Sequence, residues 1–119
     1  MRQYRGKSLK TGKWHYGGLV GDGFSGWCIC NVNMLGEIEK EKVDPKTVGQ
    51  YIGSQDLSGK SVFEGDVIKS ETGALYQVKY KNEYSKFCLC NSTVEMAGWS
   101  LSNVKVVGNI HDNPELMKG

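Results

Sequence analysis

Residues 21–32 read Gly-Asp-Gly-Phe-Ser-Gly-Trp-Cys-Ile-Cys-Asn-Val, and this stretch decides between two classes of fold. Its first six residues match the three-glycine pattern of dinucleotide-binding proteins. That pattern works only where a helix follows it and directs its N-terminus at the pyrophosphate. The next six residues read as a strand instead. The sequence therefore predicts a glycine-rich loop between two strands here, and no nucleotide site.

A second glycine-rich segment, residues 53–61, resembles a phosphate-binding P-loop. Five residues separate its glycines where the P-loop requires four, and residues 62–68 again read as a strand where the P-loop requires a helix. A β-turn at residues 57–60 accounts for the same glycine-containing sequence. Neither segment therefore predicts an α/β nucleotide-binding fold.

Short alternating segments around glycine-containing turns make up the rest of the chain, which predicts an all-β fold, a small barrel or sandwich. Helix is expected only as single turns at residues 44–47 and 113–116, where a capping Asp or Asn precedes a proline. The expected strands are three hairpins, 3–9 with 14–20, 27–33 with 37–43 and 61–69 with 74–81, followed by 86–91 and 103–110.

The chain has 119 residues, which is one ordinary domain. We expect N-terminal hairpins at residues 1–45, packed on a C-terminal part at 46–119. With 15 Lys and Arg against 13 Asp and Glu, the net charge of +2 compels neither a nucleic-acid nor a membrane partner. No segment has the length of a membrane helix or the apolar block of a secretion signal, so we expect a cytoplasmic protein with reduced thiols.

The four cysteines form a near-repeat, Trp-Cys-Ile-Cys-Asn at 27–31 and Phe-Cys-Leu-Cys-Asn at 87–91. On a strand, both sulfurs of each pair point to one face. We interpret Cys28, Cys30, Cys88 and Cys90 as small core residues, with no metal or other cofactor. The alternatives are a zinc-stabilised module using these four thiols or a cross-strand disulfide on oxidation, although a strand sets same-face positions about 6.6 Å apart, wide for one zinc ion.

Basic residues gather at the N-terminus, where the first 21 residues hold five of them and no acidic residue. Together with aromatic residues they form a candidate nucleic-acid surface, because lysine and arginine contact phosphates and aromatic rings stack on bases. The alternative is a solvated hairpin with its aromatics in the core, its charge compensated by the acidic run at 37–41. The candidate residues are Arg2, Arg5, Lys7, Lys13, Trp14 and Tyr16.

Catalytic chemistry has little support in the sequence. The two histidines, His15 and His111, have no spacing that pairs them with a nucleophile or a metal ligand. Glu64 and Asp66 flank a glycine and are better explained by turn hydrogen bonds than by an acid/base pair. We therefore expect a protein that is not an enzyme and has no catalytic residues.

Three blocks of sequence resemble the YopX family, small proteins encoded largely by phages and prophages. They stand in family order at residues 4–17, 48–68 and 106–116, and the last reads Val-Val-Gly-Asn-Ile-His-Asp-Asn-Pro-Glu-Leu. The resemblance implies an all-β fold with a small C-terminal barrel of the Src-homology-three type, and it implies no catalytic residues. Both cysteine pairs lie outside these blocks, so the resemblance says nothing about them.

The sequence and the resemblance together predict a phage or prophage protein that binds rather than catalyses. We expect an accessory module acting on an unidentified protein or nucleic acid of host or phage, in the cytoplasm of the host bacterium and without a membrane partner. A homo-oligomer is a further alternative, since unpaired strand edges can pair with those of another copy. Nucleic-acid binding through the N-terminal hairpin and a zinc-stabilised module are the alternatives.

Overall fold

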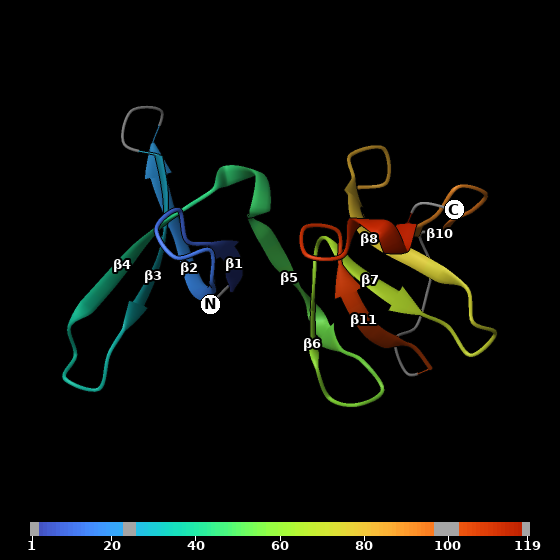
Figure 1. The fold of residues 1–119 in the computed structure, drawn as a ribbon, viewed down its shortest axis with the longest axis horizontal. Helices are drawn as coiled ribbons and strands as arrows, with labels where there is room; N and C mark the ends of the chain where they lie inside the picture. Colours follow the sequence, from blue (N-terminus) through green and yellow to red (C-terminus); the bar gives the residue numbers. More distant parts are fainter. Residues whose placement is uncertain (1–2, 23–25, 97–102, 118–119) are drawn as a thin grey trace. The chain divides into compact units, whose positions relative to one another are not determined.

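The computed structural model describes residues 3–22, 26–96 and 103–117, and within them the chain is all β, as predicted (Figure 1). The strands form two antiparallel sheets, and the described helices are two short 3-10 turns. The chain divides into two compact units, Met1–Tyr51 and Ile52–Gly119. Strand β5 (Gly49–Gln55) begins in the first unit and ends in the second.

The first unit is built from the two predicted N-terminal hairpins, and its strands follow the order β4-β3-β2-β1-β5. Gly36 adopts a φ of +80° in the turn between β3 and β4, a conformation that glycine adopts without steric cost. The Asn33 side chain closes this turn by accepting hydrogen bonds from the backbone N–H groups of Leu35 and Glu37. The strands are β1 (Tyr4–Lys7), β2 (Trp14–Asp22), β3 (Gly26–Val32) and β4 (Ile38–Val43).

The core of the first unit is small and centres on Ile29 and Val43, each 1% exposed. Gly6 lies directly against Val43, and a Cβ atom at Gly6 would come within 2.9 Å of the valine side chain. The end of β4 also returns to the end of β1, because Ser8 and Val43 form a β-bridge and Leu9 N–H donates to the Lys42 carbonyl at 3.0 Å. These contacts fix β4 beside the loop that follows β1.

The second unit contains a five-stranded sheet in the order β10-β9-β8-β7-β11. No closed barrel is found in the described residues, so the Src-homology-three-type barrel remains a prediction. The core of the second unit is a cluster of five buried residues, Val62, Ile68, Val78, Leu89 and Val104. The strands are β6 (Ser61–Phe63), β7 (Asp66–Lys69), β8 (Leu75–Lys81), β9 (Lys86–Cys90), β10 (Glu95–Met96) and β11 (Lys105–Asn109).

The strand expected at residues 61–69 is divided into β6 and β7 by a turn at Glu64 and Gly65. The buried Asp66 carboxylate accepts a hydrogen bond from Phe63 N–H at 2.8 Å across this turn. Gly65 N–H donates to the Val78 carbonyl and holds the turn against β8. Asp66 thus makes a turn hydrogen bond, as its place beside a glycine predicted, and Glu64 lies in the turn itself.

Both predicted helical turns are present, as η1 (Pro45–Thr47) and η2 (Pro114–Met117). Strand β3 begins at Gly26 and strand β6 begins at Ser61, so strands follow both glycine-rich segments, as expected. This excludes the dinucleotide and P-loop interpretations, which need a helix at these points. With three and four residues, the helices of the described ranges fall far below the length that crosses a bilayer.

Candidate functional site

One face of the first unit's sheet carries basic and aromatic side chains from β1 and β2. Arg5 lies opposite Tyr16 in this antiparallel pair, and Lys7 lies opposite Trp14. Residues directly opposite each other point to the same face of a sheet. The Arg5 Cζ atom is 4.6 Å and the Lys7 Nζ atom 5.5 Å from the centroid of the Trp14 ring. The indole is therefore held by two cation–π contacts.

Strand β4 adds two lysines to this same face. Lys40 is paired with Cys30 and Lys42 with Cys28, and the next strand places Gly18 opposite Cys30. Because alternate residues of β2 share a face, this row of residues lies on the side of the sheet that holds the β2 aromatics. Both lysines are exposed. The sheet thus places Lys40 and Lys42 on the same face as Arg5 and Lys7, which lie more than thirty residues earlier in the sequence.

The glutamates of β4 lie on the opposite face. Glu41 is paired with the buried Ile29, and Glu39 with Asn31. These four residues, together with His15, line a shallow cavity of about 230 Å³ to which Lys40 also contributes. The strand register therefore directs the lysines and the glutamates of β4 to opposite faces, although they alternate in the sequence and Lys40 also reaches the cavity on the glutamate side.

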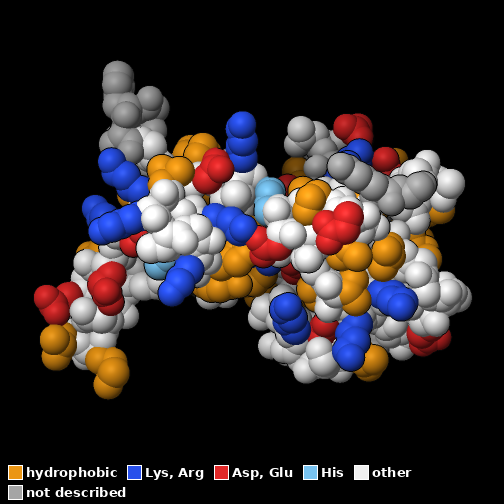
Figure 2. Space-filling model, viewed as in Figure 1, with side chains coloured by type: hydrophobic (Ala, Val, Ile, Leu, Met, Phe, Trp, Pro, Cys, Tyr) orange, Lys and Arg blue, Asp and Glu red, His pale blue; other side chains and the backbone are white. Residues whose placement is uncertain are grey.

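We call the first of these surfaces the basic face. Tyr16 is 42% and Val20 52% exposed on it, and none of the described side chains that β1 to β4 place there is acidic. In Figure 2, several Lys and Arg side chains gather over the part of the molecule that holds β1 and β2. The basic face consists of Lys7, Trp14, Tyr16, Val20, Lys40 and Lys42.

The end of the β3–β4 hairpin is apolar. Val32 and Ile38 lie opposite each other and are 68% and 69% exposed, and the turn between them exposes Met34 and Leu35. Figure 2 shows hydrophobic side chains at this end of the hairpin, with acidic side chains beside them. Val32 and Ile38 share the side of the sheet that carries Lys40, so the basic face continues into an apolar end.

A hollow of about 450 Å³ lies beside the basic face where the β1–β2 loop meets β4. Lys10, Lys40 and Lys42 line it together with Leu9 and Glu41. The Glu41 carboxylate accepts a hydrogen bond from Ser8 Oγ at 2.6 Å, which ties this acid to the loop. Three lysines around one hollow make a positively charged site that suits an anion.

The sequence-predicted residues are distributed unevenly around this site. Arg5 is only 5% exposed and packs on Trp14, so it supports the ring from within the fold. Lys7 and Trp14 are half-buried, whereas Lys13 and Tyr16 are exposed. Arg2 lies outside the described residues. Sequence reasoning missed Lys10, Lys40 and Lys42 as site residues; the two-residue alternation of β4 was the signal for the last two.

All four cysteines are free thiols, but their surroundings differ. Cys88 and Cys90 are buried in the second unit, as expected for core residues, and burial is the main cause that raises the pKa of the Cys90 thiol. Cys28 and Cys30 are only half-buried in the first. Across the described ranges, no three His, Cys, Asp or Glu side chains come together in a way that would hold a metal ion. The zinc-stabilised module stays a prediction.

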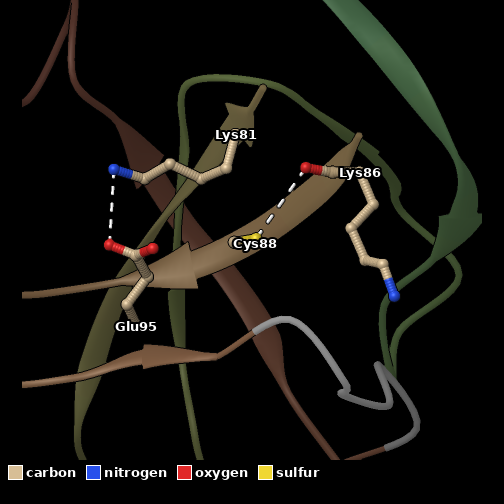
Figure 3. A network of polar contacts seen from close by, with 4 residues as sticks. All are labelled: Lys81, Lys86, Cys88 and Glu95. Atoms are coloured by element: carbon tan, nitrogen blue, oxygen red, sulfur yellow. Dashed lines mark hydrogen bonds and ion pairs between the residues drawn. The ribbon is translucent and has the colours of Figure 1, made fainter. Parts of the chain in front are cut away.

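Polar side chains at the edge of the second sheet form a small exposed network (Figure 3). Lys81 Nζ lies 3.4 Å from Glu95 Oε2, and the Glu95 carboxylate raises the pKa of both Lys81 and the neighbouring Tyr84. Cys88 Sγ approaches the carbonyl of Lys86 at 3.8 Å. These contacts are those of a surface ion pair beside a buried thiol, and they resemble no catalytic group.

The polar residues of the family blocks shape turns. Burial alone would raise the pKa of the Asp56 carboxyl, but hydrogen bonds from Val106 N–H, Lys60 N–H and both donors of Ser58 outweigh it and lower the pKa to about 2. The Asn109 side chain likewise accepts from two backbone N–H groups in the turn that follows β11. These residues hold the architecture.

The comparisons with known proteins agree with this fold. The crystal structure of protein EF1440 from Enterococcus faecalis is similar over 98% of both chains, with a TM-score of 0.64 and 17% sequence identity. At that identity the likeness concerns the fold alone. A search of curated protein sequences finds no match. The family model described as YopX protein matches residues 3–118, and the chain therefore belongs to the YopX family.

Proposed function

We propose that this YopX protein is a non-enzymatic binding module that attaches to a macromolecule through its basic face. As an accessory protein of phage or prophage type, it would act on a host or phage partner in the cytoplasm of the bacterial host. The observation that carries the proposal is the separation of charge in β4, which directs Lys40 and Lys42 to one side and Glu39 and Glu41 to the other.

The separation of charge makes one face of the first unit's sheet basic. A face with lysines and no described acid attracts an anionic partner over about a Debye length, whereas mixed charges would largely cancel. The exposed Tyr16 and Val20, and the apolar hairpin end at Val32 and Ile38, add contact area once the partner has arrived. Attraction and contact area therefore coincide on one surface.

Site-specific photo-crosslinking in bacterial cells tests the proposal. A photoreactive amino acid is placed at Val20 on the basic face and, as the matched control, at Glu39 on the opposite face; both side chains are exposed strand residues. We expect crosslinked species from Val20 and few or none from Glu39. Equal crosslinking at both positions, or none at either, would contradict a binding role for this face.

A further inference from the structure

We infer that the anionic partner of the basic face is single-stranded nucleic acid, with a phosphate group in the hollow between Lys10, Lys40 and Lys42 and a base stacked on Tyr16. This inference rests on the proposed function and names the partner of the same site. The N-terminal basic residues alone do not define such a site. It appears only when the fold places β4 beside the β1–β2 loop.

The hollow supplies the phosphate contact. Three of its five lining residues are lysines, and its single acid, Glu41, is hydrogen-bonded to Ser8 Oγ. Lys42 is fixed there by its backbone, because its carbonyl accepts from Leu9 N–H at 3.0 Å. Lysine side chains that line a hollow suit the oxygens of a phosphate, and displacement of counterions by such contacts drives nucleic-acid binding.

The neighbouring sheet face supplies the stacking contact. Tyr16 is 42% exposed on β2, and Gly18, Val20, Cys28 and Cys30 lie on the same face between it and the lysines of β4. An exposed tyrosine ring beside lysines is a surface on which a base can stack. Trp14 is half-buried and in contact with two cations, so it supports this surface more than it offers a free ring.

Charge and aromaticity together favour a single strand over the other anionic partners. Stacking needs unpaired bases, which a duplex keeps inside its helix. Every nucleotide of a single strand joins a phosphate to a base that can stack, whereas an acidic protein joins carboxylates to aromatic rings only where its own sequence does. Exposed aromatics beside lysines on a sheet are the combination by which single strands are bound without sequence preference. An acidic protein remains an outcome that the experiment can reveal.

The test measures fluorescence anisotropy of labelled dT20 and rU20 oligonucleotides with the full chain, from 50 to 200 mM salt. We expect Lys40→Ala with Lys42→Ala to weaken binding about tenfold or more and to reduce the slope of log affinity against log salt by about 1.4. Lys69→Ala with Lys79→Ala, two exposed lysines of the second unit, is the matched control and should change affinity less than twofold. Tyr16→Leu should weaken binding with the salt slope unchanged.

Three results would overturn the inference. They are the absence of binding at 50 mM salt, an equal loss in the two lysine pairs, and competition by polyglutamate as effective as that by the oligonucleotide. The last result would identify the partner as an acidic protein. If crosslinks form from Val20 while oligonucleotides do not bind, the binding module stands and the nucleic-acid partner is rejected. Unfolding midpoints are measured for all variants, to establish that each one is folded.

Discussion

Strands β3 and β9 share a sequence pattern and differ in environment. Residues 27–31 read Trp-Cys-Ile-Cys-Asn and residues 87–91 read Phe-Cys-Leu-Cys-Asn, and in both strands the central aliphatic residue is buried. The flanking cysteines separate the two, because Cys88 and Cys90 are 0% and 7% exposed whereas the cysteines of β3 are only half-buried. The same five-residue pattern thus produces one strand covered on both faces and one covered on a single face.

The neighbouring strands explain the difference. On the cysteine side of β9, the exposed Lys79 lies opposite Cys88, whereas Gln77 connects Cys90 to Val67, which is completely buried, so this side is packed towards β7. On the cysteine side of β3, the partners across the strand are Lys40 and Lys42, which are exposed. A lysine thus lies opposite a cysteine in both strands, and the buried Val67 beyond Gln77 is the neighbour that distinguishes β9 from β3.

Thiol reactivity should show the largest contrast. We expect two of the four thiols to react with a thiol reagent in the folded protein, Cys28 and Cys30, and the β9 thiols to react on the order of a hundredfold more slowly, because reagent reaches them only when the unit opens. Timed labelling followed by peptide mass spectrometry measures this. Cys28→Ser with Cys30→Ser is the control and should abolish the fast phase; a fast phase that survives would contradict the assignment.

Substitution of single cysteines should sharpen the contrast in stability. Cys88→Ser should lower the free energy of unfolding by about 1–3 kcal/mol, because it buries a hydroxyl in place of a thiol. The thiol's Sγ lies 3.8 Å from the Lys86 carbonyl, which is too long a distance for a hydrogen bond from a hydroxyl. The matched Cys28→Ser, at a half-exposed position, should stay within about 0.5 kcal/mol of the unsubstituted protein. Urea unfolding compares them, and equal losses would show that β3 is as fully covered as β9.

The pH dependence of stability should also separate the two units. The pKa of Asp56 lies at about 2, below its ordinary value of 3.8, so the carboxylate stabilises the second unit above pH 4 and this contribution is lost as pH falls through 4 towards 2. It amounts to about 2 kcal/mol at neutral pH. The protection factors of the amide hydrogens, which correct for the intrinsic pH dependence of exchange, should therefore fall more in β9 than in β3 on acidification, and Asp56→Asn should remove the difference. An equal fall in protection in both strands would contradict this role.

The sequence predicts much of this fold because glycine turns and two-residue alternation are local signals. They locate the hairpins, and the capping residues before Pro45 and Pro114 locate both helical turns. Strand β5 escapes prediction because residues 49–55 include two glycines and few apolar residues, and its pairing with β1 supplies what its own pattern lacks.

The site is harder to predict than the fold, because it depends on register. A net-charge interpretation treats the Glu-Lys alternation of β4 as neutral, whereas the pairing with β3 sends the two signs to opposite faces. The hollow around Lys10 needs a contact between residues more than thirty positions apart, Leu9 and Lys42. Nor could the two cysteine pairs be told apart, since the residues that cover β9 lie elsewhere in the chain.

The smallest effect should come from the edge strand beside β9. Glu95 on β10 lies directly opposite Cys90, and its charge is the main cause that raises the pKa of Tyr84 above its ordinary value. Glu95→Gln removes this charge, so the tyrosine should ionise at lower pH, which absorbance of the phenolate between about pH 9 and 12 detects. Tyr84→Phe is the control, because the Glu95→Gln change should leave the titration unaltered in its presence. On β4, the residues opposite the cysteines of β3 are lysines, so no glutamate takes the place that Glu95 has beside β9. If the Tyr84 titration is unaltered in Glu95→Gln, this electrostatic difference between the two strands is contradicted.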